Sequence, residues 1–174
     1  SHGLIFKIEP YDTYMTSGEV ANQTTTLKYA EDLKNGIIVI PLTYLKDITD
    51  PAKMLTVYWF KPAFITSHND FSKDTTIFIG SFCYSGAQSW KTLNQKFAKC
   101  TYFGYHKTVL DKFCVKMSIS LMDSLCDTLV KKPYTTGRWF NGLNPKKVDD
   151  RGCRMELFGD PETTLWKEME IETS

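Results

Sequence analysis

Cys83 is the residue whose type and position first indicate chemistry, because it follows an apolar segment and directly precedes a Ser-Gly turn. The apolar run 77–79 predicts a central strand of a parallel sheet, buried on both faces. Parallel α/β sheets place reactive groups just beyond the carboxyl ends of such strands. A helix is expected to begin at Ser85 or Gly86, and its N-terminus would favour the thiolate of Cys83. The alternative is a buried structural cysteine.

Three histidines could supply a proton to the leaving group of a thiol-catalysed reaction. His2 lies in an initial Ser-His-Gly, which alone would equally fit a remnant of a cloning tag. His68 has polar neighbours typical of solvated surface. His106 follows a predicted strand, so it could line a cleft or lie exposed. Only His2 is followed by glycine.

Taken in order, these motifs resemble the caspase-like (clan CD) cysteine peptidases, the group that contains caspases, legumain, clostripain and gingipain. The similarity is closest to bacterial gingipain-like and clostripain-like domains. It spans nearly the whole chain, as short motifs only. Those motifs are Ser1-His2-Gly3, Cys83-Tyr84-Ser85-Gly86, the strand at 99–105, and Gly159-Asp160-Pro161.

The resemblance implies a cysteine endopeptidase with a two-residue catalytic centre, which could also process itself. His2 would protonate the leaving amine, and Cys83 would attack the carbonyl carbon. The backbone amides of Gly3 and Cys83 would donate hydrogen bonds to the oxyanion.

The expected substrate is a peptide or protein, and Ser81, Tyr84 and His106 are the candidate substrate-binding residues. Relatives that cut after basic residues often carry an acidic residue two positions before the nucleophile. Ser81 occupies that position here, so cleavage after Arg or Lys is not expected. The alternative function is a catalytically inactive caspase-like interaction module.

The expected fold class is α/β: a three-layer α/β/α sandwich with a mostly parallel sheet and a small antiparallel insertion at about 24–60. Residues 1–174 would form the C-terminal portion of one caspase-like domain that begins at the His-Gly motif. Because a parallel sheet without its first strands would expose an edge, a preceding segment or a separate N-terminal fragment is expected to complete it.

Composition excludes several classes of protein. With 174 residues and 42% hydrophobic content the chain can bury a core, and a net charge of +1 without a basic stripe argues against nucleic-acid binding. No apolar run is long enough for a membrane span. The five cysteines include no Cys-x-x-Cys pair, so neither a metal, a cofactor nor thiol-redox chemistry is expected. The resemblance implies an extracellular, periplasmic or cell-surface location, with a cytoplasmic one as the alternative.

Local patterns predict the remaining elements. Residues 110–129 have apolar side chains at spacings of three and four, which indicates a long amphipathic helix with Cys114 and Cys126 in the core. The other predictions are a loop at 4–20, strands at 24–29, 36–41, 54–60, 101–105 and 154–158, and helices at 61–69, 85–98 and 136–141.

Overall fold

The computed structural model describes residues 3–6, 12–41, 45–47, 49–70, 75–96, 99–126, 134–143 and 147–164. His2 lies outside these residues. The helices and strands, in chain order, are β1 (Gly3–Phe6), β2 (Asp12–Val20), α1 (Gln23–Lys28), α2 (Ala30–Lys34), β3 (Ile38–Val39), β4 (Leu45–Lys46), β5 (Met54–Leu55), β6 (Val57–Phe60), α3 (Pro62–His68), β7 (Thr75–Ile79), α4 (Gln88–Lys91), α5 (Leu93–Lys96), β8 (Lys99–Tyr105), α6 (Asp111–Cys126), α7 (Thr136–Gly142) and β9 (Met155–Gly159).

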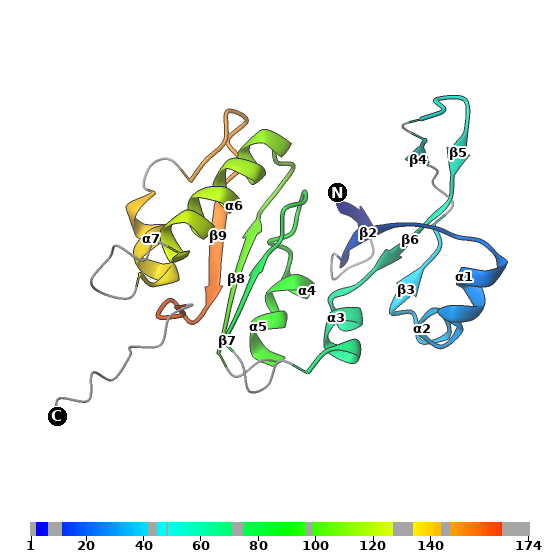
Figure 1. The fold of residues 1–174 in the computed structure, drawn as a ribbon, viewed down its shortest axis with the longest axis horizontal. Coiled ribbons are helices and arrows are strands. Elements are labelled where there is room, and N and C mark those ends of the chain that lie inside the picture. Colours follow the sequence, from blue (N-terminus) through cyan, green and yellow to red (C-terminus); the bar gives the residue numbers. More distant parts are fainter. Residues whose placement is uncertain are drawn as a thin grey trace.

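The second half of the chain forms a sheet with helices on both faces (Figure 1). Its order is β7-β8-β9, with β7 parallel and β9 antiparallel to β8. The parallel pair requires a long crossover, which the segment containing α4 and α5 provides. α6 and α7 cover one face and α4 and α5 the other, so the strand residues 100–105 are all buried. The α/β class is therefore present.

The first half of the chain forms an antiparallel sheet with the order β1-β2-β6-β3, beside which β4 and β5 make a separate pair. One face of this sheet carries Tyr14, Val57 and Trp59, which form a small core. From the other face, Met15 and Phe60 pack against the core cluster of Phe82, Trp90, Leu93, Cys100 and Tyr102. The two sheets therefore share a hydrophobic core.

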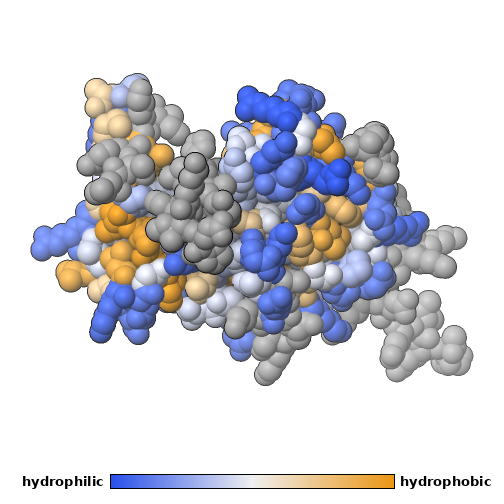
Figure 2. Space-filling view, turned by 180° about the vertical axis from the view of Figure 1, so that it is seen from behind, coloured by the Kyte–Doolittle hydropathy of each residue, from blue (hydrophilic) through white to orange (hydrophobic). Residues whose placement is uncertain are grey.

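Hydrophobic side chains also remain on the surface of the antiparallel part. Figure 2 shows the face opposite to that of Figure 1, with hydrophobic residues in separate areas among hydrophilic ones. The exposed apolar side chains of this part include Val20, Leu27, Ile40 and Met54.

Several local predictions are confirmed. Pro62 is the first residue of α3, where its missing N–H is not needed. β8, α7 and β9 lie within one or two residues of the predicted ranges. α6 buries Cys114, Met117, Leu121 and Leu125, as the periodicity indicates, but Cys126 at its end is exposed rather than part of the core.

Two predictions in the first part of the chain are wrong. Residues 4–20 contain strands β1 and β2 instead of a loop, so the antiparallel sheet reaches further toward the start than 24–60. The predicted strand 24–29 instead lies mostly in α1, which Asn22 caps at its start and which ends at Lys28. The Asn22 side chain accepts from the Thr25 amide (3.1 Å), and the Thr25 hydroxyl accepts from the Asn22 amide (3.0 Å).

The predicted sheet and crossover helix also differ from the structure. Only the β7–β8 pair is parallel; every other described pair is antiparallel, so the expected mostly parallel sheet is not found among the described strands. The helix predicted from Ser85 or Gly86 begins later, at Gln88, and is divided into α4 and α5 at Thr92. A four-residue helix that begins five residues after Cys83 gives little dipole support to a thiolate there.

Candidate active site at the Cys83 loop

The segment 80–87, called the Cys83 loop below, connects β7 to α4 and is fastened to β8 by backbone hydrogen bonds. The amides of Gly80, Tyr84 and Gly86 donate to carbonyl oxygens of residues 103–107 at 2.8, 3.1 and 2.8 Å. These bonds extend the pairing of β7 with β8 beyond the end of the strand. They fix the loop at the carboxyl edge of the parallel pair, where the sequence places Cys83.

Glycine lets the loop lie directly against β8. A Cβ atom on Gly104 would lie 2.8 Å from the Gly86 amide nitrogen and 2.9 Å from its Cα. A Cβ on Gly80 would meet the Tyr102 hydroxyl and would lie 2.7 Å from the Ser85 Cβ. Both positions therefore exclude a side chain unless the backbone moves.

Ser85 is a second anchor of the loop and is fully buried. Its hydroxyl oxygen accepts a hydrogen bond from the Tyr105 amide (2.9 Å), and its carbonyl oxygen accepts one from the Tyr102 hydroxyl (2.7 Å). Because these groups are bonded to β8, Ser85 is not available to begin a helix. This explains why the predicted helix starts later.

Cys83 has the single amide in residues 80–87 that donates no hydrogen bond within the described part of the chain. The next residue, Tyr84, has φ of 58°, and among the described residues it is the one non-glycine residue with positive φ. Such a backbone conformation costs free energy and is often found at functional sites. An N–H group that is free of internal bonds can donate to a developing oxyanion.

The Cys83 thiol is half-buried, and its Sγ lies 3.8 Å from the carbonyl oxygen of Val109. All five cysteines are free thiols. Burial raises the pKa of Cys100 to about 11, and burial is also the main cause that raises the pKa of Cys114 to about 11. Cys153 is fully buried. Among the cysteines, only Cys83 combines a position in the strand-end loop with partial exposure.

Gly3 lies on β1, whose partner strand β2 contacts the core beneath the Cys83 loop. It begins β1 and is paired with Met15 of β2. Met15 packs against the cluster that contains Phe82, the residue before Cys83. In addition, the Trp90 indole N–H of α4 donates to the Thr13 carbonyl oxygen of β2 (2.7 Å). Two contacts therefore connect β2, the partner strand of β1, with the residues on either side of Cys83.

The two described histidines have different surroundings. His68 in α3 lies 3.0 and 3.1 Å from the carboxylate oxygens of Asp32, in the antiparallel part. His106 follows β8 and is exposed; its Nδ1 lies 2.9 Å from the amide nitrogen and 3.0 Å from the carbonyl oxygen of Arg154. Nδ1 can accept from the amide when neutral and donate to the carbonyl when protonated, which keeps the ring in place in both states.

The other predicted substrate-binding residues lie on or beside the loop. Tyr84 is half-buried, and the Ser81 hydroxyl lies 3.2 Å from the Ser118 hydroxyl of α6. The structure therefore brings Ser81, Cys83 and Tyr84 together, with His106 at the end of the adjacent strand.

Sequence reasoning missed Asp149. This buried carboxylate accepts hydrogen bonds from the amides of Leu110, Arg151 and Cys153 at 2.7–3.1 Å. Burial raises the pKa of Asp149, but the bonds from Cys153, Leu110 and Arg151 outweigh it, so its pKa is lowered. It thus holds the start of α6 and the turn 149–153 together near the Cys83 loop. The Asp-Asp-Arg-Gly sequence, typical of a turn, was the available signal.

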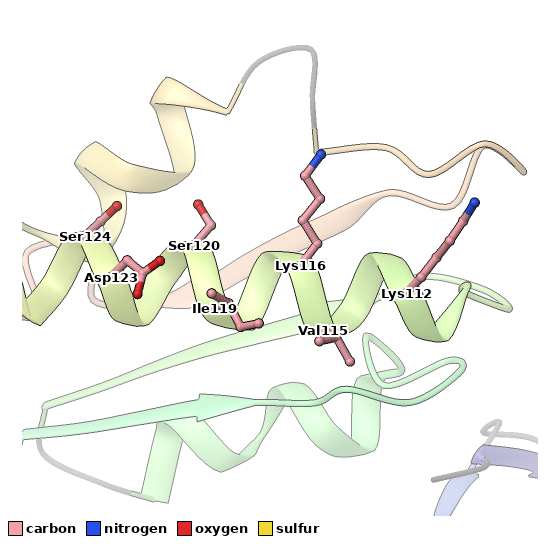
Figure 3. Close-up of a pocket in the computed structure, with 7 residues that line it drawn as sticks. All are labelled: Lys112, Val115, Lys116, Ile119, Ser120, Asp123 and Ser124. Atoms are coloured by element: carbon pink, nitrogen blue, oxygen red, sulfur yellow. The ribbon is translucent and has the colours of Figure 1, made fainter.

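A shallow hollow of about 650 Å³ lies on the outer side of α6 (Figure 3). All its lining residues belong to α6, so it is not a cleft at Cys83. Within the described residues, no group of His, Cys, Asp and Glu side chains is arranged to hold a metal ion. No described helix has the length and apolar character that a membrane crossing requires.

Comparisons of the chain with protein-family models, with curated proteins and with solved structures each gave no match. The resemblance to caspase-like peptidases therefore rests on the sequence motifs alone.

Proposed function

We propose that the chain is part of a caspase-like cysteine peptidase in which Cys83 is the nucleophile and His2 is the general acid. The observation that supports this most is the free amide of Cys83 in a loop whose other amides are all bonded. This N–H lies beside Tyr84, whose positive φ costs free energy, so the loop presents a donor that no described group uses.

The proposed reaction has two steps. The Cys83 thiolate attacks the substrate carbonyl, and the amides of Cys83 and Gly3 stabilise the oxyanion. His2 then protonates the leaving amine, and water hydrolyses the thioester and restores the thiol. The bonds of the loop to β8 keep the sulfur and the amide of Cys83 in a fixed relation throughout, which lowers the cost of reaching the transition state.

The second candidate is a catalytically inactive interaction module on the same scaffold. Two contacts favour it: the Cys83 Sγ faces the Val109 carbonyl, which stabilises a thiol rather than a thiolate, and the Ser81 hydroxyl faces Ser118 instead of an open pocket. A module of this kind would bind a peptide at the Cys83 loop without cutting it.

We also propose that β7 pairs with a further strand, from a preceding segment or a separate fragment, which would complete a caspase-like α/β/α sandwich. β7 is the edge of its sheet in the described part, and Ile77 and Ile79 are half-buried. On α6, Val115 and Ile119 are 57% and 56% exposed and line the hollow shown in Figure 3. A strand beside β7, followed by a helix on α6, would cover both surfaces.

By the same similarity, we propose an extracellular, periplasmic or cell-surface protein.

The first test of the activity is hydrolysis of a quenched fluorescent peptide library by wild-type protein and by Cys83→Ala. The proposal predicts complete loss of hydrolysis in Cys83→Ala with an unchanged urea midpoint. Hydrolysis that persists in the variant contradicts it, whereas absence of hydrolysis in wild-type protein together with peptide binding favours the interaction module.

A further inference from the structure

Two exposed cationic residues, one bonded through its backbone to the Cys83 loop and one bonded to His106 at the end of β8, have no acidic partner in the described structure. Lys107 and Arg154 are both exposed, and neither forms an ion pair there. Other cations within the described residues do form ion pairs, for example Lys91 with Glu156 and Lys112 with Asp150. Uncompensated charge at the edge that carries the nucleophile suggests an anionic ligand.

The backbone connects both residues closely to the nucleophile. The Lys107 carbonyl oxygen accepts a hydrogen bond from the Tyr84 amide (3.1 Å). Two residues further on, the Val109 carbonyl lies 3.8 Å from the Cys83 Sγ. Arg154 is held to His106 through its amide, which lies 2.9 Å from the His106 Nδ1. The segment that carries Lys107 therefore runs directly alongside Cys83 and Tyr84, and Arg154 is joined to it through His106.

The nearby carboxylates leave these charges uncompensated. Asp149 is buried and accepts three backbone hydrogen bonds, and Asp150 pairs with Lys112 at 3.5 Å. Glu156, on the strand that follows Arg154, lies 3.9 Å from Lys91. Each acidic group is thus engaged by another part of the molecule.

We infer that Lys107 and Arg154 select peptides with acidic side chains close to the bond that faces Cys83. The inference rests on the proposed binding of peptides at the Cys83 loop, and it applies to the peptidase and to the inactive module alike. Successive residues of an extended peptide are about 3.3 Å apart, and Lys and Arg side chains reach about 6 Å, so the acidic residues would lie within about two positions of Cys83. His106 between them adds a donor at Nε2.

Binding can be measured apart from catalysis in the Cys83→Ala protein. The probe is a fluorescein-labelled octapeptide with Glu at the second position on each side of a central Ala-Gly, and its comparison peptide carries Gln at both positions. Fluorescence anisotropy in 50 mM and 500 mM NaCl is expected to give about tenfold tighter binding of the Glu peptide at low salt and a smaller ratio at high salt.

The double variant Lys107→Glu/Arg154→Glu, in the same background, is expected to lose the preference for Glu over Gln. The matched control is Lys34→Glu/Lys116→Glu, which makes the same change in net charge at exposed sites on α2 and α6 and is expected to keep the preference. Equal binding of the two peptides, an unchanged preference in the first variant, or equal loss in both variants overturns the inference. If wild-type protein binds the Glu peptide selectively but does not cleave it, the peptidase proposal fails while this inference stands.

Discussion

The two regions that would form the proposed site are held in place in different ways. The Cys83 loop is bonded along its length to the buried strand β8 and touches it through Gly86 and Gly104. Gly3 instead lies on β1, at the edge of the antiparallel sheet, and among the described residues its connection to the loop runs through β2. The proposed nucleophile, Cys83, is therefore fixed within one sheet, whereas the position of Gly3 relative to it depends on packing between two sheets.

This difference has a consequence for the chemistry. The Cys83 amide and sulfur keep their mutual geometry as long as β7 and β8 stay paired. The distance from Cys83 to Gly3 depends on Met15 and on the Trp90–Thr13 hydrogen bond. Substitutions that disturb the contact of β8 with the Cys83 loop should unfold the second half of the molecule. Substitutions at Met15 or Trp90 should instead separate Gly3 from Cys83, with a smaller loss of stability.

The largest effect is expected from Gly104→Ala. The added Cβ would lie 2.8 Å from the Gly86 amide nitrogen, so β8 and the loop must move apart. We expect a loss of about 3 kcal/mol in the free energy of unfolding, measured by urea denaturation. Gly142→Ala is the matched control, because a Cβ at Gly142 would have no atom within 4 Å, and it should change stability by less than about 0.5 kcal/mol.

Trp90→Phe tests the connection between the two sheets. The ring remains apolar, but the hydrogen bond from the indole N–H to the Thr13 carbonyl is lost, which leaves a buried acceptor unpaired. We expect a loss of about 2 kcal/mol by urea denaturation, together with faster amide exchange in β2 than in β8. Equal acceleration of exchange in both strands would contradict the view that this hydrogen bond supports the antiparallel sheet more than β8.

Asp149→Asn tests whether the Asp149 carboxylate stabilises the segments beside the Cys83 loop, through the pH dependence of the free energy of unfolding. The folded-state pKa of Asp149 is lowered, so its carboxylate stabilises the fold above the unfolded pKa of about 3.9, and this contribution is lost as the pH falls through the folded-state pKa. We expect the variant to be about 1.5 kcal/mol less stable than wild type between pH 5 and pH 8. The difference should shrink below about pH 4 in urea titrations; a constant difference down to pH 2.5 would show that Asp149 does not act through its charge.

The smallest effect concerns Tyr84, whose φ of 58° favours glycine. Tyr84→Gly and Tyr84→Ala remove the same ring, but only alanine keeps the Cβ that is unfavourable in this conformation. We expect the glycine variant to be more stable than the alanine variant by about 1 kcal/mol in thermal unfolding. The opposite order, usual in helices and strands, would mean that the loop is not strained at Tyr84.

The sequence predicted the elements whose information is local. The spacing of Cys114, Met117, Leu121 and Leu125 was sufficient for α6, and the apolar run of β7 correctly ended at the Cys83 loop. The prediction of a central strand buried on both faces was wrong for the described part, where β7 is the edge of its sheet and is half-buried. Residues 24–29 were predicted as a strand because threonine favours strands. The capping box formed by Asn22 stabilises a helix there instead.

The parts that could not be predicted depend on contacts distant in sequence. The close approach of Gly104 to Gly86 and the bond between Ser85 and the Tyr105 amide arise only when β7 and β8 are paired. For the same reason, the sequence could not indicate that α4 begins at Gln88, nor that Asp149 lies beside the start of α6. The free amide of Cys83 likewise follows from where the neighbouring amides are bonded.

The rate of alkylation of Cys83, compared with that of Cys126, tests the central claim most directly. Cys126 is exposed at the end of α6, whereas Cys83 is half-buried, so exposure alone would make Cys126 react faster. We predict that iodoacetamide at pH 7 modifies Cys83 at least tenfold faster than Cys126, as measured by mass spectrometry of tryptic peptides. Labelling of Cys83 at the rate of Cys126 or more slowly would contradict its role as an activated nucleophile.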